Sequence, residues 1–276
     1  MRFPFQSRSQ SPSLRHPAPS HPPKLHSAEV AALYRGARVG GDFFEFVQVN
    51  QNRMVFVLLD IAGRRDEALH IAAAVQDSIR EQVPQKFDAS DVNETEAVTN
   101  LVLLLNHTIL STVGGVRCAP GFIGCYNEDL GIVSYVNAGS VPALLKSDGT
   151  VSILESGGLP LGLFSHATHD AQVCVLPEGA SLLLTSRGLL EVKAGGEEYG
   201  LDRLKNSLLQ ANGSNANDLC SFILQNVSEF VEQNKRRNFF SRGERNGTEV
   251  DALGENDTTA VALIRNAARA TAAGAR

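Results

Sequence analysis

The sequence has little of what several protein classes need. Its apolar runs fall well short of the roughly 20 residues that a membrane-spanning helix requires, and its N-terminus lacks the apolar segment of a secretory signal. Basic residues are outnumbered, with 25 Lys and Arg against 30 Asp and Glu and a formal net charge of −5. Nucleic acids and anionic membranes favour basic surfaces. We therefore expect neither as a partner and predict a cytoplasmic protein.

Cysteine is also scarce. The four cysteines, Cys118, Cys125, Cys174 and Cys220, are widely spaced and form no CxxC pair. A disulfide framework or a zinc site needs a tighter spacing or an accompanying histidine cluster. We predict neither, which favours a reducing compartment, and we expect Cys118 and Cys125 to be ordinary strand residues.

The composition that is present, 43% hydrophobic and 20% charged, is that of one sizeable globular domain. Residues 1–24 hold six of the eleven prolines, four basic residues and no acid. Such a segment buries too little apolar surface to offset its ordering entropy. We predict a disordered basic arm over 1–25, a folded domain over 26–266 and an Ala-rich tail over 267–276; a docking or targeting role for the arm is the alternative.

Hydrophobic periodicity predicts the elements of this domain. Strands at 28–35, 43–49 and 53–60 read as a meander, and an amphipathic helix is expected from 66 to 83 and another from 94 to 112. Six short strands follow, then two helices and a last strand; the expected bounds are 201–211, 216–237 and 257–265. This order predicts an α/β fold in which an antiparallel β-sandwich of two sheets is flanked by helices.

Two acidic residues stand at strand ends. Asp42 follows Gly40 and Gly41, and Asp60 ends the apolar strand "RMVFVLLD". A buried strand end is a costly place for a carboxylate unless it is hydrogen-bonded, paired or bound to a metal. Singly, each is best interpreted as a turn cap; together with their glycines they indicate a site.

Six motifs then carry a resemblance to a known family. In order they are "ARVGGDFFEF", "LLDIAG", "YVNAGSVPALL", "GLPLGLF", "EGASLLLTSRGLLEV" and "NDTTAVAL". Over residues 27–265 the chain resembles the PPM metal-dependent protein phosphatases (type 2C), in the branch of stage II sporulation protein E and RsbU. Six ordered motifs are far more specific than a lone "GGD".

This resemblance implies a PPM phosphatase-like α-β-β-α sandwich with two Mn²⁺ or Mg²⁺ ions at one end. The ions lower the pKa of a bridging water and aim it at a phosphoserine or phosphothreonine. By the same resemblance, Asp60 is the bridging metal ligand, the backbone carbonyl of Ile61 is its neighbour, and Asp42 completes the cluster. Carboxylate oxygens suit such hard cations.

The chain departs from the family's pattern at several positions. Arg187 stands where the strand normally ends in a metal-binding Asp, and Asn256 stands at the first position of the late Asp-Asp motif. Ser140 replaces the usual histidine after "NAG". An asparagine still offers a neutral oxygen, whereas a guanidinium offers no lone pair and repels a dication. We expect at least one metal to be weakened or lost, although Glu191, Glu255 or Asp257 could compensate.

Two functions remain open after these departures. One is a metal-dependent phosphoserine/phosphothreonine phosphatase with weak activity. The other is a pseudophosphatase that binds a phosphoprotein, such as an anti-sigma or anti-anti-sigma partner, with Arg187 taking the phosphate. Arg187 could equally turn outward or pair with Glu191 or Asp60.

The remaining candidates favour plain interpretations. His70 and His107 lie alone on helical faces. His166, His169 and Asp170 share a polar loop that we expect to be solvated rather than metal-binding. Ser186 lacks the GxSxG elbow. The basic run 234–237 suits a helix C-terminus rather than nucleic acid, and the polar loop 241–256 is predicted to be mobile and near the site.

Overall fold

The computed structural model describes residues 15–36, 41–114, 117–212, 215–241 and 257–267, with side chains of 236–241 excepted. Twelve strands and five helices lie in these ranges. The first half comprises β1 (Ala28–Arg35), β2 (Asp42–Gln48), β3 (Arg53–Asp60), α1 (Arg65–Phe87), α2 (Glu94–Thr112), β4 (Gly121–Asn127), β5 (Ile132–Ala138), β6 (Ala143–Ser147) and β7 (Thr150–Ile153). The second half comprises β8 (Gln172–Val175), β9 (Ser181–Thr185), α3 (Arg187–Leu190), β10 (Lys193–Ala194), β11 (Glu197–Glu198), α4 (Gly200–Gln210), α5 (Ala216–Ser241) and β12 (Thr258–Arg265).

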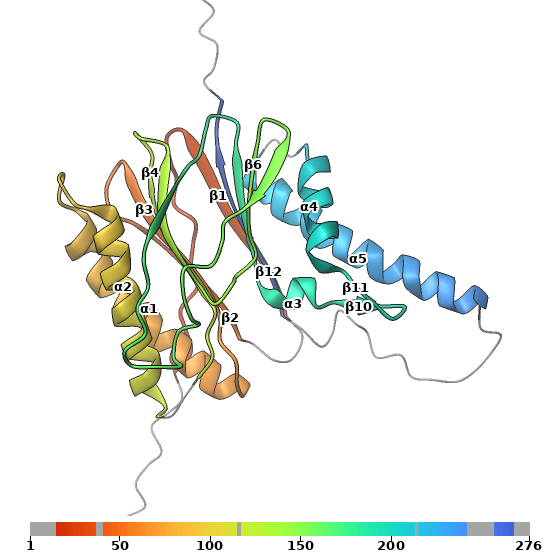
Figure 1. Ribbon diagram of the computed structural model, residues 1–276, viewed down its shortest axis with the longest axis horizontal. Helices are drawn as coiled ribbons and strands as arrows, with labels where there is room; N and C mark the ends of the chain where they lie inside the picture. The colour runs from red at the N-terminus through yellow and green to blue at the C-terminus, as the bar shows by residue number, and fades with distance from the viewer. Residues whose placement is uncertain (1–14, 37–40, 115–116, 213–214, 242–256, 268–276) are drawn as a thin grey trace, which may run out of the picture.

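Two five-stranded antiparallel sheets face each other between two layers of helices (Figure 1). One sheet has the order β1-β12-β9-β6-β7 and the other the order β2-β3-β4-β5-β8. Helices α1 and α2 cover the outer face of the second sheet, and α4 and α5 cover the first (Figure 1). The predicted sandwich flanked by helices is therefore confirmed.

Strand β3 shows how the sequence specifies these layers. Met54, Phe56 and Leu58 point into the core between the sheets, whereas Val55, Val57 and Leu59 pack under α1 and α2. A strand with both faces covered needs apolar residues at every position, because successive side chains point to opposite faces. This accounts for the unbroken apolar run that ends at Asp60.

The first strand differs from the expected meander. β1 pairs antiparallel with β12 at the far end of the chain, from Ala28 opposite Arg265 to Arg35 opposite Thr258. β2 and β3 form the predicted hairpin, but they belong to the other sheet. Apolar alternation indicates a strand without naming its partner, so the meander was wrong for β1.

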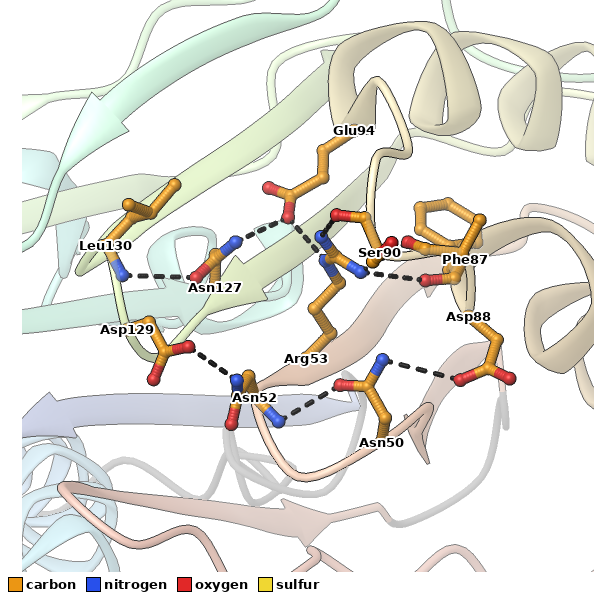
Figure 2. A network of polar contacts seen from close by, with 11 residues as sticks. Asn50, Asn52, Arg53, Phe87, Asp88, Ser90, Glu94, Asn127, Asp129 and Leu130 are labelled. Carbon is orange, nitrogen blue, oxygen red and sulfur yellow. Dashed lines mark hydrogen bonds and ion pairs between the residues drawn. The ribbon is translucent and has the colours of Figure 1, made fainter.

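A buried polar network joins the helical layer to the strand turns at the end of the sandwich where β3 begins (Figure 2). Arg53 Nε lies 2.7 Å from Glu94 Oε1, and its guanidinium also donates to the carbonyls of Phe87, Ala89 and Ser90. Asn127 Nδ2 donates to the same Glu94 oxygen at 2.7 Å. The network therefore fixes the end of α1 and the start of α2 against β3 and β4.

The N-terminal arm is ordered over its described part, which composition did not predict. From residue 15 it runs as extended chain against α1 and β2, and Leu25 packs at the edge of the core between the sheets. Local composition missed this order because the partners of the segment are distant side chains. Residues 1–14 and 268–276 lie outside the described residues.

Candidate functional site

Asp42 and Asp60 lie side by side at one end of the second sheet. Asp42 opens β2 and Asp60 closes β3, and the register of this hairpin places them directly opposite each other. Like charges in that position repel, since directly opposed side chains stand roughly 5 Å apart at Cβ. The sequence places two partly buried carboxylates where hydrogen bonds or a cation can stabilise both.

Asp42 receives hydroxyl donors from two other elements. Thr259 on β12 donates through Oγ1 to Asp42 Oδ2 at 2.6 Å, and Ser186, which precedes α3, also donates to this carboxylate. Burial raises the pKa of Asp42 to about 7, against the lowering effect of these two hydroxyls, and the nearby charges of Asp60 and Asp257 raise it further. The carboxylate is thus held in place without a compensating positive charge.

Asp60 has a cationic neighbour. Burial raises its pKa, and the positive charge and backbone N–H of Arg187 oppose this rise, while Glu191 and Asp257 add to it. The Arg187 guanidinium itself lies 3.0 Å from Glu191 Oε1, one helical turn further on, and is half exposed. Of the alternatives for this arginine, the structure shows pairing with Glu191 beside Asp60.

The backbone around Ile61 explains one glycine of the site. Ile61 N–H donates to the carbonyl of Gly41 at 2.8 Å. A Cβ placed on Gly41 would stand 2.6 Å from the Ile61 carbonyl oxygen, closer than real atoms come. Only glycine lets the chain before Asp42 approach this carbonyl so closely.

Asp257, which directly precedes β12, supports the same corner. Its Oδ2 accepts the Gly41 N–H at 2.8 Å, and its Oδ1 accepts the Tyr34 hydroxyl at 2.8 Å. Burial, followed by this bond, raises the pKa of Tyr34. Asp257 is therefore occupied in holding the loop that carries Asp42.

The oxygens that the structure describes at this corner are of the kind that a hard divalent cation takes. Asp42 and Asp60 lie opposite each other and Ile61 follows Asp60, and a cation held between the opposed carboxylates would relieve their repulsion. Among the residues that the structure describes, no group of three His, Cys, Asp or Glu side chains gathers at metal-binding distance. Asn256, the degenerate fourth position, lies outside the described residues, as do Glu255 and the loop 242–256.

The weaker candidates lie away from this corner. His169 turns inward, where its Nε2 lies 2.8 Å from the Leu159 carbonyl, so the loop around it is not simply solvated as predicted. His166 and Asp170 stay exposed. His70 receives the Arg15 N–H on its Nδ1. The four cysteines are free thiols.

Sequence reasoning missed three residues of the site. These are Tyr34, Thr259 and Ser186, the last as a hydrogen-bond donor. Each contacts a residue far away in the chain; Tyr34 and Asp257, for example, are 223 positions apart. The late motif "NDTT" marked Thr259 without giving its partner. Nothing near Tyr34 in the sequence indicated a contact.

Comparisons with known structures find the same fold. The RsbU and RsbW domains of a Mycobacterium tuberculosis protein match with a TM-score of 0.63 and 23% identity over 87% of this chain and 62% of that one. The phosphatase domain of SpoIIE from Bacillus subtilis with a regulatory fragment matches with 0.65 and 15% over the same shares. The SiaA-PP2C domain of Pseudomonas aeruginosa matches with 0.61 and 16% over 85% of each chain. No curated protein sequence matches significantly.

The chain thus spans less than two thirds of the first two relatives. No helix among the described residues is long and apolar enough to cross a membrane. A family model, that of stage II sporulation protein E, matches residues 50–238, which is more than half of the sequence. With the sandwich and the Asp42–Asp60 corner in place, the chain belongs to the SpoIIE family of PPM-type phosphatase domains.

Proposed function

We propose that this domain recognises a phosphoserine or phosphothreonine protein and hydrolyses it weakly or not at all. The observation that carries the proposal is Arg187, which lies beside Asp60 where the resemblance calls for a metal-binding Asp. Asp42, Asp60 and the Ile61 carbonyl would hold one Mn²⁺ or Mg²⁺. A cation bound there would lower the pKa of a coordinated water.

The chain's own residues would supply the remaining chemistry. Thr259 and Ser186 orient Asp42, and Asp257 holds the preceding glycine, so hydrogen bonds of the chain itself position the Asp42 carboxylate. Arg187 offers a planar donor fork that matches phosphate oxygens. Its side chain is half exposed and is tied to Glu191 through a surface pair, a contact of little energy that a phosphate could replace.

That exposure also favours the second candidate, a pseudophosphatase that binds without hydrolysis. In that case the guanidinium takes over phosphate binding and leaves no activated water. We propose a partner of the anti-sigma or anti-anti-sigma type, because one structural neighbour joins RsbU and RsbW domains. Four free cysteines accord with a cytoplasmic setting.

The test restores the missing carboxylates. Mn²⁺ is titrated calorimetrically into wild type and into the Arg187→Asp, Asn256→Asp double variant, and both are assayed on a phosphoserine peptide. We expect the double variant to bind Mn²⁺ at least about tenfold more tightly, a difference of roughly 1.4 kcal/mol, and to turn over faster.

The matched control is Arg187→Gln with Asn256 unchanged, which removes the positive charge without adding a ligand. It should gain less affinity than the double variant. Efficient turnover by wild type at micromolar Mn²⁺ would contradict the proposal and show that other acids compensate.

A further inference from the structure

Two buried polar side chains face the N-terminal arm. Glu45 on β2 is 2% exposed and Gln76 on α1 is 3% exposed, and the side-chain amide of Gln76 donates to the Glu45 carboxylate. Buried polar groups need hydrogen-bond partners, and a buried carboxylate needs several. Part of that need is met by residues 18–20 of the arm.

Gln76 forms two hydrogen bonds with the backbone of one arm residue, Ala18. The Ala18 N–H donates to Gln76 Oε1 at 2.7 Å, and Gln76 Nε2 donates to the Ala18 carbonyl at 2.8 Å. Pro17 and Pro19 flank Ala18 and have no N–H to offer. The proline pattern therefore leaves one amide donor in this stretch, and Gln76 takes it.

Glu45 binds the next polar group of the arm, the Ser20 hydroxyl. The Ser20 hydroxyl donates to Glu45 Oε1 at 2.8 Å, and the Phe46 N–H donates back to Ser20 Oγ at 3.2 Å. Arg80, one turn after Gln76, lies 3.1 Å from Glu45 Oε2 and 3.3 Å from the Pro19 carbonyl. One cation thus compensates the carboxylate and holds the arm.

We propose that this face of α1 and β2 is a binding site for an extended Pro-Ala-Pro-Ser peptide, and that residues 17–20 occupy it as an intramolecular ligand. The site has the parts of a peptide-binding site. Gln76 makes two hydrogen bonds to the peptide backbone, Glu45 accepts the serine hydroxyl, and Arg80 donates to a peptide carbonyl. Prolines pre-form the extended backbone, so little entropy is lost on docking. A segment of the same pattern from another protein would compete with the arm.

The experiment uses the full chain with the arm released. Ala18→Pro removes the one N–H that Gln76 accepts and leaves the domain's own residues unchanged. A fluorescent peptide of the sequence HPAPSHPP is titrated into this variant and into wild type, and its anisotropy is followed. We expect it to bind the variant about tenfold more tightly, because in wild type the tethered arm competes at a millimolar effective concentration.

Three controls make the assignment specific. The same peptide N-methylated at its alanine should not bind, and the Ala18→Pro, Gln76→Ala chain should not bind the unmodified peptide. His21→Ala, at an exposed position beside Ser20, should behave as wild type. Circular dichroism checks that each variant is folded.

Equal affinity for wild type and Ala18→Pro, or binding to neither, would overturn the proposal. A concentration-dependent dimer of wild type that Ala18→Pro abolishes would assign the arm to a second copy instead, and would overturn the intramolecular ligand. The test involves neither metal nor phosphate, so it is independent of the proposed function.

Discussion

Asp42 carries the clearest pH dependence at the scale of single residues. Its pKa in the folded state is about 7, whereas the ordinary value is 3.8. Between these values the folded protein binds a proton that the unfolded chain has released. The contribution of Asp42 to stability is therefore complete below about pH 4 and is lost as the pH rises through about 7.

Asp42→Asn removes this titration and keeps an oxygen for Thr259. In chelator-containing buffer, the free energy of unfolding of the variant relative to wild type should rise from pH 5 to pH 8, by roughly 1.4 kcal/mol per unit of pKa shift at most. Urea denaturation at several pH values measures the difference. A flat profile of this difference would contradict the raised pKa of Asp42.

Gly41 allows a second prediction at this scale. The added methyl group of Gly41→Ala would overlap the Ile61 carbonyl oxygen, so the backbone before Asp42 must move. We expect a loss of about 1–3 kcal/mol of stability, measured by thermal and urea unfolding. Gly157→Ala is the matched control, because its Cβ would stand 3.2 Å from the nearest atom, the Asp170 carbonyl oxygen, and should cost less.

At the scale of elements, the Arg53–Glu94 pair determines how α1 and α2 meet the second sheet (Figure 2). Both side chains are buried, at 12% and 8% exposure. Arg53→Met would leave Glu94 buried without its cation and should cost about 3–5 kcal/mol, as for other broken buried pairs. Urea unfolding of Arg53→Met, Glu94→Leu and the double variant gives the coupling.

The double variant should recover much of the loss, because two apolar side chains can replace a buried ion pair at little cost. Equal stability of Arg53→Met and wild type would contradict this prediction, because it would show that neither the pair with Glu94 nor the bonds to the backbone carbonyls contributes. The cycle thus separates the pair from the packing around it.

Elements were easier to predict than their partners. The apolar run of β3 and the one-sided pattern of α2 identify themselves, since burial on two faces or on one leaves a periodic trace. The pairing of β1 with β12 leaves no periodic pattern in the sequence, because the whole fold brings these two distant segments together. The Asp42–Asp60 pair could be predicted from the sequence because the two residues belong to one hairpin, whereas the bond between Tyr34 and Asp257 could not.

At the scale of the whole molecule, three apolar cores stabilise the fold. One lies between the sheets and one under each helical layer. Arg187 supplies positive charge beside Asp60, where it opposes the rise in the pKa of that carboxylate. The charge of Arg187 thus acts on Asp60 in the same direction as the charge of a bound metal ion would, but a guanidinium cannot activate a water molecule.

Because Arg187 supplies positive charge beside Asp60, we expect the melting temperature of wild type to respond only weakly to metal. A chelator should leave the Tm of wild type unchanged, and millimolar Mn²⁺ should raise it only slightly. Arg187→Asp should melt lower in chelator, because a further carboxylate joins Asp60 and Glu191, and its Tm should rise steeply with Mn²⁺, since a ligand at 100 times its Kd stabilises by about 2.7 kcal/mol. Scanning calorimetry across a Mn²⁺ series measures both. A wild-type Tm that falls in chelator would mean that a metal, and not Arg187, balances the charge of this site.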